Sequence, residues 1–219
     1  MDTKNRKGKN NKKDKKRIAV LASGYGSNLQ AIIDYITNDG LNGEIVLVFS
    51  NNKEAYALKR AEKSGIKIFC MSPEQFQSRK EYDRQLIKIL KGEQVDLIVL
   101  AGYMLLVGPE FIAEFRNKII NIHPALLPAF KGTHGIKDAF EYGVRVTGVT
   151  VHFVNKELDS GPIIMQEAVY IKENDTLESL EAKIHKVEHK IYPLAVKYFC
   201  DDLLKIKGRK VVILTKTNN

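Results

Sequence analysis

Asn121 and His123 are the residues of this chain whose types and spacing most readily suggest chemistry. They stand two apart at the end of a run that begins at Lys118, so on an extended backbone both side chains project from one face. Pro124 follows at once; it lacks a backbone N–H and disfavours helical angles at the residue before it, which predicts a strand ending at this pair. Open α/β sheets place their chemistry at such strand ends, although a polar pair that only satisfies its own hydrogen bonds is the commoner outcome.

Two further segments make a catalytic role for this pair the better interpretation. Leu126-Leu127-Pro128 continues the first segment, and the second runs from Val151 to Pro162 with the sequence VHFVNKELDSGP. Together they resemble the folate-dependent formyltransferase family, and the resemblance covers nearly all of residues 17–215. It implies an enzyme of de novo purine synthesis that transfers a formyl group from 10-formyltetrahydrofolate, a cosubstrate, to the amino group of glycinamide ribonucleotide.

Formyl transfer to an amine requires stabilisation of an oxyanion and removal of a proton from the attacking nitrogen. His123 and Asn121 are suitable donors to that oxyanion. Asp159 is the candidate carboxylate for supporting a charged His123, because its loop should turn sharply at Ser160-Gly161-Pro162. The resemblance likewise implies a catalytic group of Asn121, His123 and Asp159. No nucleophilic Ser or Cys is required, so we expect direct transfer between two bound substrates.

A glycine-containing loop, residues 23–28 (SGYGSN), follows the apolar run 17–22. Four apolar residues come next at helical spacing, which predicts strand, loop and helix in succession: Leu29, Ile32, Ile33 and Ile36. We expect Ser27 or Asn28 to cap the helix, whose free N–H groups favour an anion. Spacing alone is a weak signal, because the loop has neither the dinucleotide-binding nor the Walker pattern. The resemblance implies that Gly26, Ser27 and Asn28 hold the phosphate of the ribonucleotide.

The resemblance also implies further binding residues on both substrates. On the ribonucleotide they are His185 and Glu188. On the folate they are Arg79, Met104, Leu105, Leu106, Val107, Asn121, Asn155, Lys156, Glu157, Leu158 and Asp159. Several relatives carry arginine where this chain has Leu105, which leaves open the contacts to the glutamate tail of the folate.

A metal site is not predicted. His185 and His189 stand four apart on an expected helix, a spacing that can bind zinc. No third ligand is evident, and the sequence is not the His-Glu-x-x-His pattern. We therefore expect no metal.

The order of strands and helices predicts one α/β domain. Strands are expected at 17–22, 44–50, 66–71, 95–102, 119–122, 145–154, 162–171 and 210–214, and helices after 28 and at 55–64, 79–91, 136–142 and 177–205, the last interrupted at Pro193. Such alternation favours a doubly wound, Rossmann-like, mostly parallel sheet. Strands 145–154 and 162–171 should pair antiparallel because only a short loop joins them, making the sheet mixed. The resemblance implies the formyltransferase fold.

Charge is concentrated at the N-terminus. The chain of 219 residues has a net charge of +9, and residues 1–17 hold nine Lys or Arg against two Asp, or +7. We expect residues 1–16 to form a disordered basic tail and 17–219 the formyltransferase domain. We expect small-molecule substrates, no specific nucleic-acid partner and no membrane; the assembly stays open, a homodimer being one option. With no signal peptide and two cysteines that form no disulfide framework, a cytoplasmic location is expected.

Three rival functions remain. A formyltetrahydrofolate deformylase would use water as acceptor, but that family adds an N-terminal regulatory domain. A methionyl-tRNA formyltransferase would add a C-terminal nucleic-acid-binding domain. A non-catalytic folate or nucleotide binding module would not need Asn121, His123 and Asp159 together.

Overall fold

The structure is a computed structural model that describes residues 15–215. The expected basic tail falls almost entirely outside these residues. In chain order the elements are β1 (Lys16–Leu21), α1 (Ser27–Asp39), β2 (Gly43–Ser50), α2 (Tyr56–Lys63), β3 (Ile68–Cys70), the 3-10 turn Pro73–Gln75, α3 (Arg79–Gly92), β4 (Leu97–Leu100), α4 (Pro109–Glu114), β5 (Ile119–His123), α5 (Gly135–Tyr142), β6 (Val146–Phe153), β7 (Ile163–Tyr170), α6 (Leu177–Cys200), β8 (Leu204–Lys207) and β9 (Lys210–Ile213).

The strands form one sheet in the order β3-β2-β1-β4-β5-β6-β7-β9-β8. Strands β1 to β5 pair in parallel, and β6 pairs antiparallel with both β5 and β7. The predicted mixed, mostly parallel α/β sheet is therefore confirmed. Strand order reverses between β1 and β4, which is where open sheets of this kind leave a crevice at their carboxyl ends.

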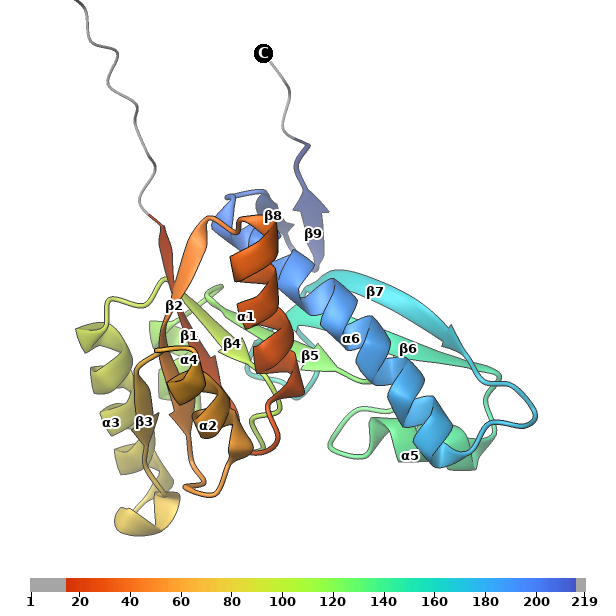
Figure 1. Ribbon diagram of the computed structural model, residues 1–219, viewed down its shortest axis with the longest axis horizontal. Coiled ribbons are helices and arrows are strands. Elements are labelled where there is room, and N and C mark those ends of the chain that lie inside the picture. The colour runs from red at the N-terminus through yellow and green to blue at the C-terminus, as the bar shows by residue number, and fades with distance from the viewer. Residues whose placement is uncertain (1–14, 216–219) are drawn as a thin grey trace, which may run out of the picture.

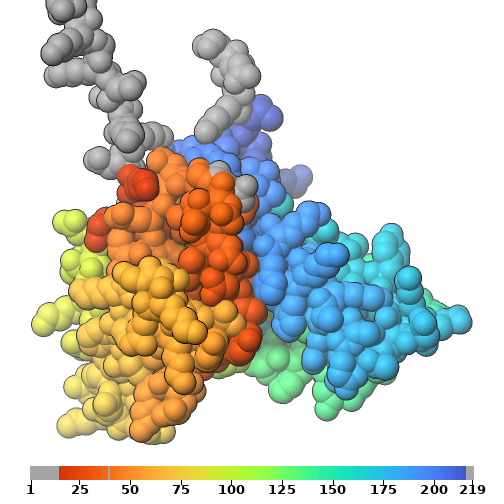
Figure 2. Space-filling view, in the orientation of Figure 1, coloured from red at the N-terminus to blue at the C-terminus, as the bar shows by residue number. Residues whose placement is uncertain are grey.

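Helices cover both faces of the sheet, which explains the nearly continuous apolar character of the central strands. Alternate residues of β1 enter two separate clusters: Val20 packs with α1, α2 and α6, and Leu21 packs with α3 and α4. In Figure 1, α1 and α6 cross the same face of the sheet. Figure 2 shows these two helices side by side at the surface, α1 in orange and α6 in blue. This contact brings the start of α1 beside the middle of α6.

Tyr192 of α6 anchors that helix to the centre of the sheet. Its side chain is fully buried, and its hydroxyl lies 2.8 Å from the carbonyl oxygen of Leu100 and 3.1 Å from that of Ile120. One hydroxyl thus spans the neighbouring strands β4 and β5.

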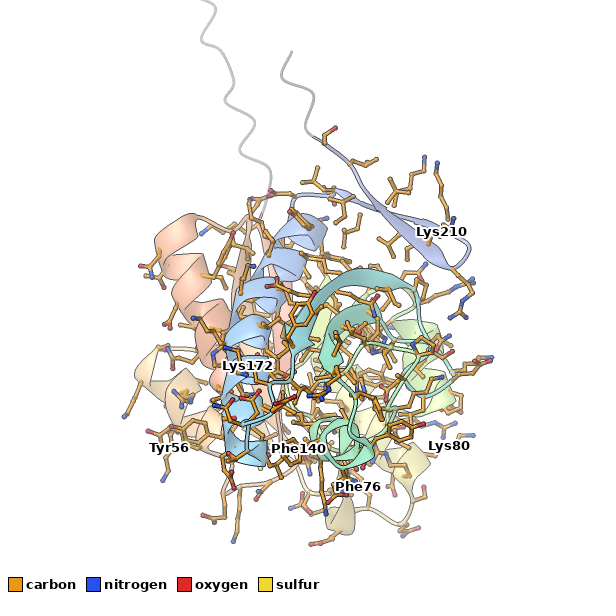
Figure 3. The ribbon with its side chains drawn as sticks, turned by 90° about the vertical axis from the view of Figure 1, so that its right-hand side faces the viewer. Tyr56, Phe76, Lys80, Phe140, Lys172 and Lys210 are labelled. Carbon is orange, nitrogen blue, oxygen red and sulfur yellow. The ribbon has the colours of Figure 1, made fainter. Side chains whose placement is uncertain are left out.

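Two expectations about the C-terminal part were wrong. The long helix is not interrupted at Pro193, and it ends at Cys200 instead of residue 205. Burial of Ile191, Tyr192, Ala195 and Val196 around the proline outweighs the local cost of about 3 kcal/mol that a helix-interior proline carries. The residues beyond it form β8, whose hairpin with β9 carries the labelled Lys210 at the edge of Figure 3.

Smaller differences concern element ends. Strand β1 begins at Lys16, one residue before the expected domain boundary, because Lys16 pairs with Gly43 of β2. The expected strands 66–71 and 95–102 shorten to β3 and β4, and the short helix α4 was not predicted. Among residues 15–215 no helix is both long enough and apolar enough to cross a bilayer.

Replacing Tyr192 by Phe tests the anchor. We expect Tyr192→Phe to lower the free energy of unfolding by about 1 kcal/mol, the usual net value of a buried hydrogen bond. Urea denaturation measures this, and the m-value should not change. Tyr170→Phe is the control, because Tyr170 is 71% exposed. Equal stability of the two variants would contradict an anchoring role for the Tyr192 hydroxyl.

Candidate active site

The predicted site residues gather at the carboxyl ends of the parallel strands. The glycine loop follows β1, residues 101–108 follow β4, and Asn121 and His123 belong to the last three residues of β5. Figure 3 shows Tyr56, Phe76 and Phe140, which come after β2, β3 and β5 in the chain, at one end of the molecule, while Lys210 lies at the other. We call this end the carboxyl rim.

Asn121 meets His152 across the antiparallel pair β5–β6. The two residues are directly opposite in register, and Asn121 Nδ2 lies 3.3 Å from His152 Nε2. His152 Nδ1 is 2.9 Å from the carbonyl oxygen of Phe153, which can only accept, so Nδ1 carries the proton. Nε2 then accepts one N–H of Asn121, which fixes the orientation of the amide and leaves its other N–H for a ligand.

Burial keeps His152 neutral. Its side chain is almost fully buried, and this desolvation lowers the pKa of His152 below its usual value, against a smaller opposing effect of the hydrogen bond to Phe153. The nearby carboxylate of Asp159 also opposes the shift, at 3.8 Å from Nε2. That separation is too long for a hydrogen bond.

Asp159 lies between two histidines. Its Oδ2 is 3.6 Å from His123 Nδ1, and the side chain is 8% exposed. The same oxygen accepts the backbone N–H of Gly132 at 2.9 Å. The predicted convergence of Asn121, His123 and Asp159 is thus present in the structure, and His152 joins it as a fourth member.

A tight turn after Asp159 sets the position of its carboxylate. Asp159 has the left-handed φ of 47°, a conformation that asparagine and aspartate adopt more readily than most residues. Gly161 follows at a point where a Cβ would lie 1.7 Å from the carbonyl oxygen of Phe153. Only glycine lets the loop approach the end of β6 this closely.

The other ring nitrogen of His123 makes a hydrogen bond within the protein. Nε2 lies 2.7 Å from the carbonyl oxygen of Phe130, so it donates its proton there. Gly135 lies close by, since a Cβ on it would be 3.3 Å from Nε2. A ligand that takes the Nε2 proton must displace the Phe130 carbonyl.

The loop after His123 is fastened to β6 and β7. Buried Thr150 donates to the carbonyl of Ala125 at 2.7 Å and accepts the N–H of Leu127 at 3.0 Å. Gln166 of β7 donates to the same hydroxyl and to the Leu127 carbonyl. These bonds satisfy backbone groups that a loop leaves unpaired.

The glycine loop has the expected position but a different cap. Gly26, with φ 75°, is the N-cap of α1, and no side chain caps the helix. The expectation that Ser27 or Asn28 caps it was wrong, because both lie inside the first turn. The first-turn N–H groups therefore lack a side-chain cap, and no acidic residue lies in that turn. A helix start of this kind favours an anion.

Asn28 is instead joined to α6. Its Nδ2 donates to Glu188 Oε2 at 3.0 Å, and His185 Nδ1 lies 2.9 Å from the same oxygen. Glu188 is 4% exposed. Asn28 Oδ1 is buried without a partner among the described residues, so it can accept an N–H or O–H group of a ligand. All the expected ribonucleotide residues thus belong to one cluster.

A groove of about 530 Å³ starts at this cluster and runs along α1. Ser27, Arg60 and His189 are among its lining residues. The guanidinium of Arg60 lies 4.5 Å from the centre of the Tyr25 ring and donates from Nε to the Tyr25 carbonyl at 3.0 Å. Ser27 borders this groove and Asn121 and His123 do not, so the groove adjoins the start of α1.

Among the expected folate residues, Leu105 and Val107 lie with α3 at the second apolar cluster, on the face of the sheet away from α1 and α6. Arg79 contacts the segment 104–107 through the carbonyl of Leu106. Leu105 packs against the second apolar cluster instead of facing solvent. Among the residues of the later loop, Lys156, Glu157 and Leu158 are exposed, whereas Asn155 bonds the backbone of Ser160 and so braces the turn.

Residues 15–215 show no obvious metal site. There, no group of three or more His, Cys, Asp or Glu residues is arranged to hold an ion. His185 and His189 stack with ring centres 6.3 Å apart. The absence of a metal stays a prediction.

Several residues that hold the candidate site together had no pattern in the sequence that indicated this role. Arg60, Thr150 and Asp83 lie within elements whose pattern indicated only core and solvent faces. Each makes a bond to a residue far along the chain, such as Arg60 to Tyr25. His152 lies in a segment expected to be a strand, but its partnership with Asn121 required the register of β5 and β6.

Comparisons with known proteins agree on one family. The sequence model described as Formyl transferase matches residues 16–196. Phosphoribosylglycinamide formyltransferase from Bacillus subtilis is 42% identical over 182 residues, which cover 83% of this chain and 93% of that protein. The structure of glycinamide ribonucleotide transformylase 1 from Symbiobacterium toebii has 45% identity and a TM-score of 0.90, covering 93% of this chain and 96% of that one.

A structural neighbour of lower sequence identity bears the name of a different activity. A formyltetrahydrofolate deformylase from Pseudomonas syringae has a TM-score of 0.87 at 26% identity. The match covers 93% of this chain and 67% of that chain.

Substitution of Gly161 tests the turn that positions Asp159. In Gly161→Ala the new Cβ overlaps the Phe153 carbonyl, so the loop must move. We expect a loss of about 1–3 kcal/mol in stability, and displacement of Asp159 from His123. Chemical denaturation and the imidazole NMR signals of His123 measure both. Gly92→Ala is the control, because a Cβ there meets nothing within 4 Å; unchanged His123 signals in Gly161→Ala would contradict the positioning.

The pair His185–Glu188 predicts a pH-dependent contribution to stability. The hydrogen bond to Glu188 raises the pKa of His185 above its usual value of about 6.5. The stabilisation is therefore fully present below about pH 6.5 and is lost as pH rises through the raised pKa.

We expect His185→Gln to lower Tm relative to the unmodified protein at pH 6, with the difference shrinking towards pH 9. Thermal unfolding across this range measures the difference. A Tm difference that stays constant with pH would contradict a charged pair.

Proposed function

The chain belongs to the formyl transferase family, and on this premise we propose that the protein transfers a formyl group from 10-formyltetrahydrofolate to the amino group of glycinamide ribonucleotide. This is a step of de novo purine biosynthesis. The relative from Bacillus subtilis and the solved structure from Symbiobacterium toebii bear the names of that activity. The deformylase neighbour is less similar, at 26% identity.

One observation carries the proposal beyond the family. Three residues that span 38 positions of the chain converge at the carboxyl rim: Asn121, His123 and Asp159. Asp159 lies within ion-pairing reach of both His123 and His152, and Asn121 lies within hydrogen-bonding reach of His152. A protein that only binds folate or nucleotide has no need of a buried carboxylate opposite an imidazole. This arrangement suits acyl transfer.

His123 and Asn121 supply the oxyanion donors. The amine attacks the formyl carbon, and negative charge develops on the formyl oxygen. His123 Nε2–H, once released from the Phe130 carbonyl, and the free N–H of Asn121 donate to that oxygen. Hydrogen-bond donors aimed where charge develops are usually the largest single contribution to such catalysis.

Asp159 stabilises the positive charge that His123 carries when both its nitrogens are protonated. As the tetrahedral intermediate collapses, the bond between the formyl carbon and N10 of the folate breaks. The attacking nitrogen gives up one proton and N10 gains one, so the products are the formylated ribonucleotide and tetrahydrofolate. No acyl-enzyme forms.

His152 acts on the reaction through Asn121. Because burial keeps His152 neutral, its Nε2 accepts from the Asn121 amide and holds the remaining N–H towards the oxyanion. His152 is therefore a positioning residue.

The two substrates approach from opposite sides. The ribonucleotide places its phosphate at the uncapped start of α1, at Gly26, Ser27 and Asn28, and Glu188 with His185 contacts the same molecule. The folate lies against Met104 and Leu106, which are 65% and 70% exposed, with Arg79, Leu105, Val107, Asn121 and residues 155–159 completing its site. We expect the reaction to proceed without a metal. A cytoplasmic location stays a prediction, and the assembly stays open.

Turnover of 10-formyltetrahydrofolate with and without glycinamide ribonucleotide tests the function. We expect turnover only with the ribonucleotide. Loss of the His123 donor in His123→Ala should lower kcat about 100-fold or more. Folding of the variant is checked by its unfolding curve.

Other results would identify the alternatives. Turnover without the ribonucleotide that is also lost in His123→Ala indicates a deformylase. No turnover under either condition, with folate still bound, indicates a binding module. Trapping of a formylated protein would refute direct transfer.

A further inference from the structure

The segment from Gly102 to Gly108, which joins β4 to α4, alternates between buried and exposed side chains. Tyr103, Leu105 and Val107 pack on the second apolar cluster, whereas Met104 and Leu106 are largely exposed. The segment has no strand partner. Something other than a sheet ladder must therefore hold its backbone.

Ser23 holds the first half of the segment. Its backbone N–H donates to the carbonyl of Gly102 at 3.0 Å, and its hydroxyl accepts the N–H of Met104 at 2.8 Å. The same hydroxyl donates to Asn51 Oδ1 at 2.5 Å. Ser23 opens the glycine loop, so the first half is tied to that loop.

Asp83 holds the second half from α3. Its Oδ2 accepts the N–H of Gly108 at 2.9 Å, and its Oδ1 accepts Arg79 Nε at 2.9 Å. Arg79 in turn donates to the carbonyl of Leu106. One carboxylate thus controls two backbone groups of the segment, one directly and one through Arg79.

The burial of Asp83 makes its two hydrogen bonds necessary. Asp83 is 3% exposed, and a buried carboxylate must be both paired and hydrogen-bonded. The two bonds meet that requirement. They are also charge-assisted, hence stronger than bonds between neutral groups.

We propose that Asp83 is a positioning residue for the formyl donor: it fixes the segment 104–107 so that Met104 and Leu106 present a preformed apolar surface to the folate. The proposal rests on the proposed function. Asp83 does not touch the reacting atoms. It acts through Gly108 and Arg79, and its loss should weaken folate binding while leaving the ribonucleotide side unaffected.

Asp83→Asn is the direct test. An amide offers one acceptor oxygen in place of two, and its NH₂ group then faces another donor, so either the Gly108 bond or the Arg79 bond is lost. We expect the KM for 10-formyltetrahydrofolate and the Kd for tetrahydrofolate to rise about tenfold. The KM for glycinamide ribonucleotide should stay within about twofold, and amide exchange at Gly108 should accelerate.

Gly108→Ala is a second, independent test. Gly108 has φ −75°, which alanine adopts freely, but a Cβ there would lie 2.3 Å from Asp83 Oδ2. The substitution pushes the carboxylate away without deleting it. It should reproduce the selective loss of folate affinity. If Asp83→Asn fails to fold, Gly108→Ala still tests the proposal.

Asp201→Asn is the matched control. Asp201 pairs with Lys197 across one helical turn at 2.7 Å. Its side chain is 6% exposed, close to the 4% of the Asp83 side chain taken without its backbone. It lies at the C-terminal end of α6, away from the carboxyl rim. It should alter stability without changing the KM for 10-formyltetrahydrofolate.

The outcomes separate this proposal from the function on which it rests. Wild-type turnover with unchanged folate KM and Kd in folded Gly108→Ala and Asp83→Asn would overturn the positioning role alone. Parallel rises in both KM values would also overturn it, since they indicate general disruption. Absence of wild-type turnover would refute the proposed function, and the proposal with it.

Discussion

The carboxylate of Asp159, buried between the imidazoles of His123 and His152, is the interaction on which the rest of the site depends. A buried charge is expensive unless it is paired and hydrogen-bonded. Here Gly132 donates a backbone N–H to it, and the rings stand opposite its two oxygens. The antiparallel pairing of β5 with β6 and the close approach of Gly161 to Phe153 both serve to bring this carboxylate to the end of β5.

The loops around it follow one physical rule. Segments beyond the strand ends leave backbone groups without ladder partners, and buried polar side chains satisfy them. Thr150 does so for the loop after His123, Ser23 and Asp83 do so for the segment after β4, and Asn28 ties α1 to Glu188. These side chains fix the loops of the rim to the sheet and to one another.

Local pattern identified most elements but not their ends. The apolar runs and the helical spacing of Leu29, Ile32 and Ile36 predicted strands and helices that the structure contains. The same reasoning failed at Pro193, where packing on the sheet outweighed a local helix breaker, and it extended the helix over the residues of β8. It also assigned the cap of α1 to a polar residue, whereas the left-handed Gly26 occupies that position. At Pro193 contacts distant in the chain decided the outcome, whereas the hairpin of β8 with β9 is a local pairing.

The sequence by itself determined the alternation that makes a doubly wound sheet, the Asn-x-His pair at a strand end and the family to which the chain belongs, because these depend on residue type and short spacing. Only the tertiary structure decided that His152 orients Asn121, that Asn28 reaches Glu188 across 160 positions, and that Asp83 holds the segment after β4. Such bonds join residues whose separation in sequence carries no periodic signal, and they exist only once the sheet register and the helix packing have brought the residues together.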